Sequence, residues 1–231
     1  MKSFIVEKKY ILFPVSMDAP CKMVTVCSEG EKIFEFDIPV ENGNSPYRFQ
    51  YYAPLNVEKW KGQEITIEVE DALDFLDAVG FSDDRVDTVQ HKPQIHFSPE
   101  SGWINDPNGL IYVNDRYHLF FQYNPFQNQW GNLCWGHAVS RDLLHWEQLD
   151  TAMFPDENGS MFSGCGIINE RGLLELPDSA LLFFYTMAGG KTKWSEGKKF
   201  TQNLAYSLDE GNTLKKVNPP VIEHIADENR D

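Results

Sequence analysis

The sequence has no long apolar run and few basic residues. No stretch approaches the ~20 consecutive apolar residues that a membrane-spanning helix needs. It contains 20 Lys and Arg against 35 Asp and Glu, which gives a formal net charge of −15. Nucleic acids and anionic membrane surfaces are bound through clustered Lys and Arg, so we expect neither as a partner. The charged side chains of Lys2, Glu7, Lys8 and Lys9 interrupt any secretory apolar segment, which predicts a cytoplasmic location for the chain as written, with secretion as the alternative.

Cysteine is also scarce. The four cysteines are Cys21, Cys27, Cys134 and Cys165, and no Cys-x-x-Cys pair or zinc-type spacing with histidine occurs among them. Four scattered cysteines do not make a disulfide framework, so we predict free thiols. No metal ion and no other cofactor is expected.

The chain is nevertheless rich enough in apolar residues to fold. Its 231 residues are 42% hydrophobic and 13% aromatic, which excludes a disordered acidic segment. Residues 1–90 contain short β-branched and aromatic runs, and alternation of apolar and polar residues is clear at 34–38 and 64–70. These runs predict a small antiparallel β-sandwich with strands at 10–15, 22–26, 32–38 and 64–70. Only residues 72–79 favour a helix, with Leu73, Leu76 and Val79 on one apolar stripe.

Residues 91–231 contain an internal repeat. Residues 117–123 are echoed 63 positions later by 180–186, and residues 136–142 are echoed 67 positions later by 203–209. Each copy has the pattern of four strands, with turns predicted at 113–116, 140–143 and 209–212. A four-stranded unit of this length is typical of a β-propeller blade, although two unrelated meanders are the alternative. Two blades do not close a ring, so we expect the sequence to be cut short.

The segment Trp103–Gly109 reads Trp-Ile-Asn-Asp-Pro-Asn-Gly and is predicted to lead into the first strand of the first blade. Asp-Pro-Asn-Gly alone has the residues that a type I turn prefers. The flanking Trp103 and Asn105 add a stacking face and an amide beside the carboxylate of Asp106, and such groups suit a sugar ring.

Further polar and aromatic residues fall at equivalent places. Gln122 ends a strand and Trp130 lies in the loop 124–134, while Phe162-Ser163-Gly164 opens the second blade. Arg230 and Asp231 would open a third blade. In a ring, Asp106 and Asp231 would converge on one axis, and two facing carboxylates are the ingredients of glycoside hydrolysis.

Taken together and in this order, these motifs closely resemble glycoside hydrolase family 32, which includes invertases, levanases and inulinases. The resemblance covers about residues 93–231 and implies a five-bladed β-propeller, here incomplete. Residues 1–90 resemble the small β-sandwich that precedes the propeller in some bacterial members. The implied activity is hydrolysis of terminal β-fructofuranosyl bonds in sucrose or fructans by a retaining double displacement.

The resemblance also implies roles for single residues. Asp106 matches the nucleophile, and Asp231, next to Arg230, matches the aspartate that holds fructose hydroxyls and stabilises the transition state. The residues that match the lining of the fructose subsite are Asn105, Gln122, Trp130, Phe162 and Ser163.

One catalytic group of the family has no counterpart in this sequence. The general acid and base is a glutamate in a Glu-Cys-Pro motif, and no Glu-Cys pair occurs here. We therefore expect the 231-residue chain alone to be inactive or nearly so. Two alternatives are a non-catalytic remnant that binds fructan, and a structural or interaction protein whose propeller half is vestigial. A small or polymeric fructoside is the expected partner, and the sequence predicts no oligomeric state.

Overall fold

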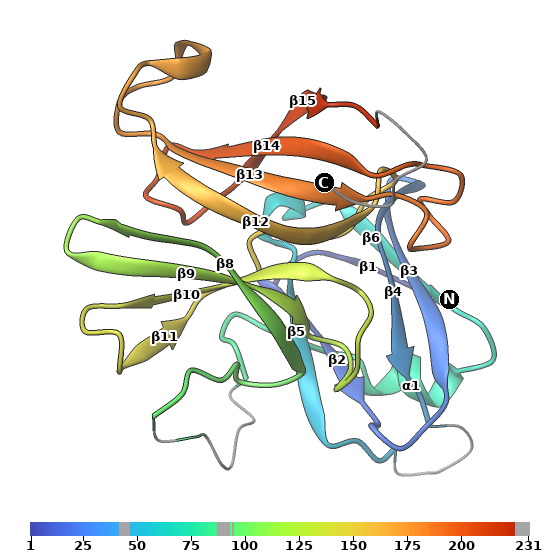
Figure 1. Ribbon diagram of the computed structural model, residues 1–231. Helices are drawn as coiled ribbons and strands as arrows, with labels where there is room; N and C mark the ends of the chain where they lie inside the picture. Colours follow the sequence, from blue (N-terminus) through green and yellow to red (C-terminus); the bar gives the residue numbers. More distant parts are fainter. Residues whose placement is uncertain (42–46, 87–92, 94, 225–231) are drawn as a thin grey trace. The chain divides into compact units, whose positions relative to one another are not determined.

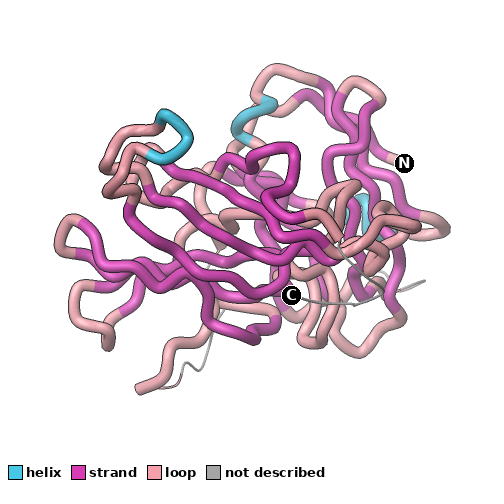
Figure 2. Tube along the Cα trace, turned by 45° about the horizontal axis from the view of Figure 1, so that its top comes forward, coloured by secondary structure: helices cyan, strands magenta, loops and turns pink. Residues whose placement is uncertain are grey.

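A computed structural model describes residues 1–41, 47–86, 93 and 95–224 of the chain (Figure 1). The chain divides into two compact units. Unit 1 comprises Met1–Lys92, Pro99–Trp103 and Asn124–Asn132, and unit 2 comprises Pro93–Ser98, Ile104–Tyr123 and Leu133–Asp231. Strands make up most of the regular structure of both units (Figure 2), which confirms the all-β class. The predicted boundary between residues 90 and 91 lies outside the described residues and stays a prediction.

Unit 1 contains two antiparallel sheets. The first has the order β1 (Lys2–Ile5), β6 (Glu64–Val69), β3 (Cys21–Ser28) and β4 (Glu31–Pro39), and the second has the order β5 (Tyr51–Asn56), β2 (Tyr10–Val15) and β7 (Gly80–Ser82). The four predicted strands are confirmed to within two residues at each end. The strands β1, β5 and β7 were not predicted, because they are short or carry charged residues or Pro54, so that local sequence alone gives them a weak signal.

The core of unit 1 is aromatic. All six residues of β2 are buried, and the ring of Phe13 lies 5.1 Å from that of Phe36 on β4. Phe75 of the helix α1 (Leu73–Ala78) is stacked on Phe13 at 6.3 Å. The predicted helix is confirmed, but the predicted apolar stripe is wrong at Leu73, which is 74% exposed. The larger Phe75 is buried instead, since its ring removes more apolar area from water.

Unit 2 contains two four-stranded antiparallel sheets. The first has the order β11 (Trp146–Gln148), β10 (Cys134–Ser140), β9 (Arg116–Asn124) and β8 (Trp103–Val113), and the second has the order β12 (Ser160–Ile168), β13 (Leu181–Ala188), β14 (Thr201–Ser207) and β15 (Lys215–Ile222). In each sheet, strands that follow one another in the chain are neighbours, so both copies of the predicted repeat form the meander of a propeller blade. The predicted turns are confirmed by left-handed residues at Asn114 and Asp115 and at Glu210 and Gly211.

The predicted place of the Trp103–Gly109 segment is wrong. The segment does not precede the first strand but forms the first seven residues of β8. Pro107 is tolerated there because β8 is the edge strand of its sheet, where a missing N–H need not break the ladder. Gly109, with φ of +50°, adopts a left-handed conformation that is costly for other residues.

The two sheets of unit 2 share one apolar core. The ring of Phe120 on β9 meets that of Phe183 on β13 edge-on at 4.8 Å. Trp135 on β10 lies 5.9 Å from Tyr185 on β13, also edge-on. All four rings are at most 2% exposed. This packing holds β8, β9 and β12 close together, and these are the strands that carry the candidate site.

Candidate active site

Four of the residues predicted for the site form one chain of side-chain hydrogen bonds. The amide Nδ2 of Asn105 donates to Oε1 of Gln122 at 3.2 Å. In turn, Nε2 of Gln122 donates to Oγ of Ser163 at 3.4 Å, and this hydroxyl donates to Oδ2 of Asp106 at 2.7 Å. Three strands of two sheets contribute, so only the packed unit brings these residues together.

The network fixes one oxygen of Asp106 and leaves the other open. The side chain is half-buried. Its Oδ2 accepts the hydroxyl hydrogen of Ser163, while no donor among the described residues reaches Oδ1. A carboxylate held at one oxygen has a defined orientation, which is what a nucleophile or a general base requires.

An irregularity in β12 aims Ser163 at Asp106. The register between β12 and β13 shifts between Met161 and Gly164, so Phe162 and Ser163 lie in a β-bulge. Bulges re-aim side chains and are common beside active sites. Gly164 is required next to the bulge, because a Cβ atom there would lie 2.1 Å from the carbonyl oxygen of Phe184.

Two residues that hold this bulge were missed in the sequence analysis. Oδ1 of Asn108 accepts the backbone N–H of Gly164 at 3.2 Å, and Nε1 of Trp135 donates to the carbonyl oxygen of Phe162 at 2.9 Å. The alternation of β8 gave a signal for Asn108, since it lies two residues after Asp106 on the same face. Asn108 is 2% exposed, and its Nδ2 has no hydrogen-bond partner among the residues that the structure describes.

The remaining predicted residues are not members of this network or are outside the described chain. Phe162 is half-buried, with its ring edge-on to Phe200 at 5.6 Å. Trp130 is 55% exposed and belongs to unit 1, whereas the network lies in unit 2. Arg230 and Asp231 lie outside the described residues, so their predicted place beside Asp106 stays a prediction.

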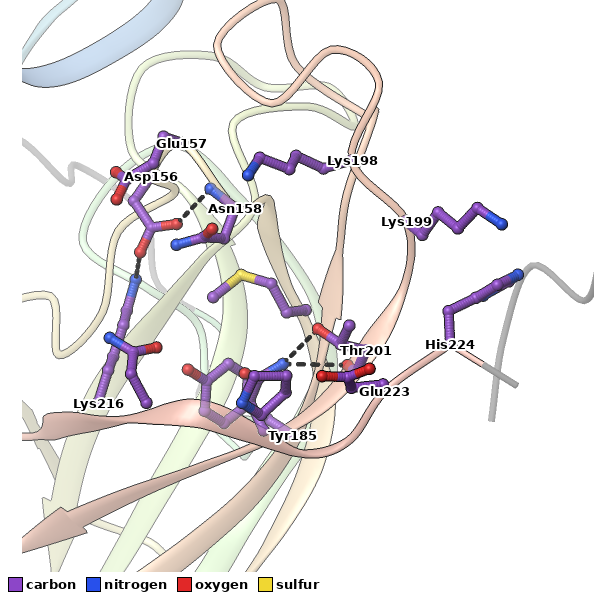
Figure 3. A pocket seen from close by; sticks show the side chains of 14 residues that line it. Asp156, Glu157, Asn158, Tyr185, Lys198, Lys199, Thr201, Lys216, Glu223 and His224 are labelled. Carbon is purple, nitrogen blue, oxygen red and sulfur yellow. Dashed lines mark hydrogen bonds and ion pairs between the residues drawn. The ribbon is translucent and has the colours of Figure 1, made fainter. Parts of the chain in front are cut away.

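A separate hollow of about 440 Å³ lies on the second sheet of unit 2 (Figure 3). Its walls carry charges of both signs, and Nζ of Lys216 pairs with Oδ2 of Asp156 at 2.6 Å. None of the four residues of the network around Asp106 is among the described residues that line it, so the network is not part of this hollow. In the described part of the chain, no group of three or more His, Cys, Asp or Glu side chains could hold a metal ion, and no helix is long and apolar enough to cross a bilayer.

Glycoside hydrolases act with a pair of carboxylates, and the network supplies one oriented carboxylate, that of Asp106. The sequence comparison agrees: residues 96–231 match the glycosyl hydrolases family 32 N-terminal domain. The chain belongs to glycoside hydrolase family 32, as its motifs predicted.

Individual relatives are similar over part of their length. A levanase from Bacillus subtilis is 41% identical over 164 residues, which cover 68% of this chain and 23% of the levanase. An invertase from Schizosaccharomyces pombe is 41% identical over 144 residues, which cover 57% of this chain and 24% of the invertase. The structure of a fructofuranosidase from Schwanniomyces occidentalis complexed with fructose superposes with a TM-score of 0.51 at 39% identity, over 57% of this chain and 26% of that one. The chain thus spans about a quarter of the length of these relatives.

Proposed function

We propose that this chain carries the nucleophile half of a retaining β-fructosidase site, with Asp106 as the nucleophile. Hydrolysis of terminal β-fructofuranosyl bonds in sucrose or fructans is the activity of the complete site. The proposal includes a small N-terminal β-sandwich over residues 1–90 and the first blades of a five-bladed propeller over residues 91–231. The observation that carries it is the hydrogen bond from Ser163 to Asp106 within the chain of amides.

In the first step, Oδ1 of Asp106 attacks the anomeric carbon of the fructosyl unit. A carbon–oxygen ester bond forms, the bond to the leaving oxygen breaks, and that oxygen takes a proton from a general acid. Water then attacks the same carbon, loses a proton to the same group acting as base, and releases the carboxylate of Asp106. The hydroxyl of Ser163 holds Oδ2 through both steps, so that Oδ1 stays aimed at the substrate.

The amides beside Asp106 suit the hydroxyl groups of a sugar. Each carboxamide nitrogen has two N–H groups. Asn105 and Gln122 each use one of them inside the network, which leaves the second for a ligand. Asn105 is exposed to solvent. With the exposed indole of Trp130 as a stacking face, these groups make up the fructose subsite that we propose, together with Phe162, Ser163 and Arg230.

The resemblance implies that the general acid and base is a glutamate in a Glu-Cys-Pro motif, and these 231 residues contain no Glu-Cys pair. General acid–base catalysis contributes about 10²–10⁴-fold, and a sugar leaving group depends on protonation. We therefore propose that the 231-residue polypeptide alone turns over natural fructosides barely or not at all. Fructan binding without cleavage is the second candidate function, and the carboxamides of Asn105 and Gln122 beside Asp106 support it.

β-Fructosyl fluoride tests the role of Asp106 without a general acid, because fluoride leaves without a proton. Mixing it with the 231-residue chain should release fluoride and increase the intact protein mass by one fructosyl residue, which peptide mapping should locate at Asp106. Asp106→Asn should abolish the adduct. Asp115→Asn, in the exposed turn that follows β8, is the matched control and should leave it unchanged.

The other outcomes discriminate between the functions. An adduct that persists in Asp106→Asn would contradict the proposed nucleophile. Absence of an adduct, together with fructose binding that Asp106→Asn weakens, would favour the binding remnant. Sucrose hydrolysis by the 231-residue chain that Asp106→Asn abolishes would refute the proposed need for a further carboxylate.

A further inference from the structure

The segment that begins with the last residue of β9 and ends two residues before β10 belongs to unit 1, although the rest of β9 and all of β10 lie in unit 2. It comprises Asn124–Asn132. At its base, Asn124, Phe126 and Gln127 are at most 8% exposed, whereas Trp130 near its tip is 55% exposed. The segment is therefore anchored at its base, while the side chain of Trp130 is exposed to solvent and does not belong to a core.

Phe126 is part of the core of unit 1. Its ring is stacked on that of Phe36 with the centroids 3.7 Å apart and the planes 6° apart. It also lies 6.1 Å from the ring of Phe13, edge-on. Phe36 is on β4 and Phe13 is on β2, so Phe126 contacts both sheets of unit 1. Strands β2 and β4 therefore hold, in the core of unit 1, a side chain from a segment far along the sequence.

Polar contacts hold the same segment at one backbone position of β4. The N–H of Asp37 donates to Oδ1 of Asn132 at 2.9 Å. The carbonyl oxygen of Asp37 accepts Nδ2 of Asn132 at 2.7 Å and Nε2 of Gln127 at 2.9 Å. The amide of Asn132 thus satisfies both backbone groups of Asp37, as a neighbouring strand would. Tyr51 adds a hydrogen bond from its hydroxyl to the carbonyl oxygen of Pro125 at 3.3 Å.

The segment is also cross-linked internally by Asn124. Its Oδ1 accepts the N–H of Phe126 at 3.1 Å and Nδ2 of Asn132 at 3.1 Å. Its Nδ2 donates to the carbonyl oxygen of Gln129 at 2.9 Å. Residues on both sides of Trp130 are therefore fixed, while the indole itself stays exposed and available for stacking on a ligand.

We propose that unit 1 is the scaffold that positions Trp130 for sugar binding, with Phe36 and Asp37 as positioning residues that act through the segment. This inference rests on the proposed function, in which Trp130 lines the fructose subsite. Without the anchor, the segment would populate many conformations, and the observed affinity would fall in proportion to the fraction that still presents Trp130.

Hydrogen exchange and fructose titration of the 231-residue chain test this scaffold role. Phe126→Leu removes the aromatic stack, and Asn132→Ala removes the contacts with Asp37. Phe34→Leu is the matched control, because Phe34 is buried on the same strand β4 but packs on Trp60 instead. We expect Phe126→Leu and Asn132→Ala to accelerate amide exchange over 124–132 and to raise the dissociation constant for fructose roughly tenfold, the effect of a binding-competent fraction near one tenth.

Exchange in β3 and β6 should stay slow in both variants, which separates release of the segment from unfolding of unit 1. Phe34→Leu should change neither the exchange over 124–132 nor the fructose affinity. Unchanged exchange over 124–132 in both Phe126→Leu and Asn132→Ala would overturn the inference.

Trp130→Ala separates this inference from the proposed function. If Trp130→Ala weakens fructose binding and Phe126→Leu does not, the scaffold role is overturned while the proposed subsite stands. If Trp130→Ala has no effect, the proposed subsite is wrong at this residue, and the exchange data still show whether unit 1 holds the segment.

Discussion

A pair of buried histidines predicts that acid destabilises unit 2. His118 on β9 and His137 on β10 are 4% and 1% exposed. Their ring nitrogens Nδ1 and Nε2 lie 3.2 Å apart. One nitrogen must donate and the other accept, so the contact does not survive protonation of both rings. Burial, with Arg116 nearby, lowers the pKa of His118, while burial and the neighbouring His118 lower the pKa of His137 to about 3, against an opposing effect of Asp209.

The sign of the effect follows from where protons bind. In the unfolded chain a histidine has a pKa of about 6.5. Between pH 6.5 and pH 3, His137 is therefore protonated in the unfolded state but neutral in the folded state. The contribution of neutral His137 to stability is complete above pH 6.5 and is lost as the pH falls toward 3. At pH 5 the loss from His137 alone is about 2 kcal/mol, and the lowered pKa of His118 adds to it in the same direction.

Urea unfolding at pH 7 and pH 5 measures this loss. The free energy of unfolding of the wild-type chain should fall between these pH values by about 2 kcal/mol more than that of His137→Gln, which has no titratable group at this position. His96→Gln, at an exposed position, is the matched control and should keep the wild-type dependence. Equal pH dependence in the wild type and in His137→Gln would refute the argument.

Three further outcomes test the bulge of β12. Ser163→Ala removes a hydrogen bond to a charged group, which is worth about 1.5–3 kcal/mol. We therefore expect fructosylation of Asp106 by fructosyl fluoride, measured as stopped-flow fluoride release, to slow by roughly 10–100-fold. An unchanged rate would contradict the role of the hydroxyl. Gly164→Ala forces a Cβ atom against the carbonyl oxygen of Phe184, so thermal unfolding should show a loss of more than about 2 kcal/mol, and wild-type stability would contradict the packing. Asn108→Ala leaves the N–H of Gly164 without its acceptor and should cost about 1–3 kcal/mol in urea unfolding, whereas a neutral effect would show that the bulge holds without it.

The local pattern of apolar and polar residues was sufficient to predict the position of many strands. The alternation at 64–70 and the echo of 117–123 in 180–186 depend on side chains a few residues apart, and both gave strands where they were predicted. The segment Trp103–Gly109 shows the limit of such reasoning. Its residues favour a turn locally, yet it is a strand, because pairing of β8 with β9 in the folded sheet outweighs the local preference.

The candidate site also has features that the sequence predicted and features that only the structure shows. The resemblance of the motifs to glycoside hydrolase family 32 identified Asn105, Asp106, Gln122 and Ser163 as one set, because the motifs occur in the order of that family along the chain. The sequence could not show which of them touch, nor that Asn108 and Trp135 hold the bulge, because these contacts join residues up to 57 positions apart.

The sequence by itself determined the family and the strand periodicity, because these depend on motifs and short spacing, and it predicted Asp106 as the reacting carboxylate. Only the tertiary structure decided that Ser163 holds Oδ2 of Asp106 and that Phe126 enters the core of unit 1. Both depend on distances between strands brought together by burial of apolar side chains, and burial is a property of the whole fold that no local stretch of sequence contains.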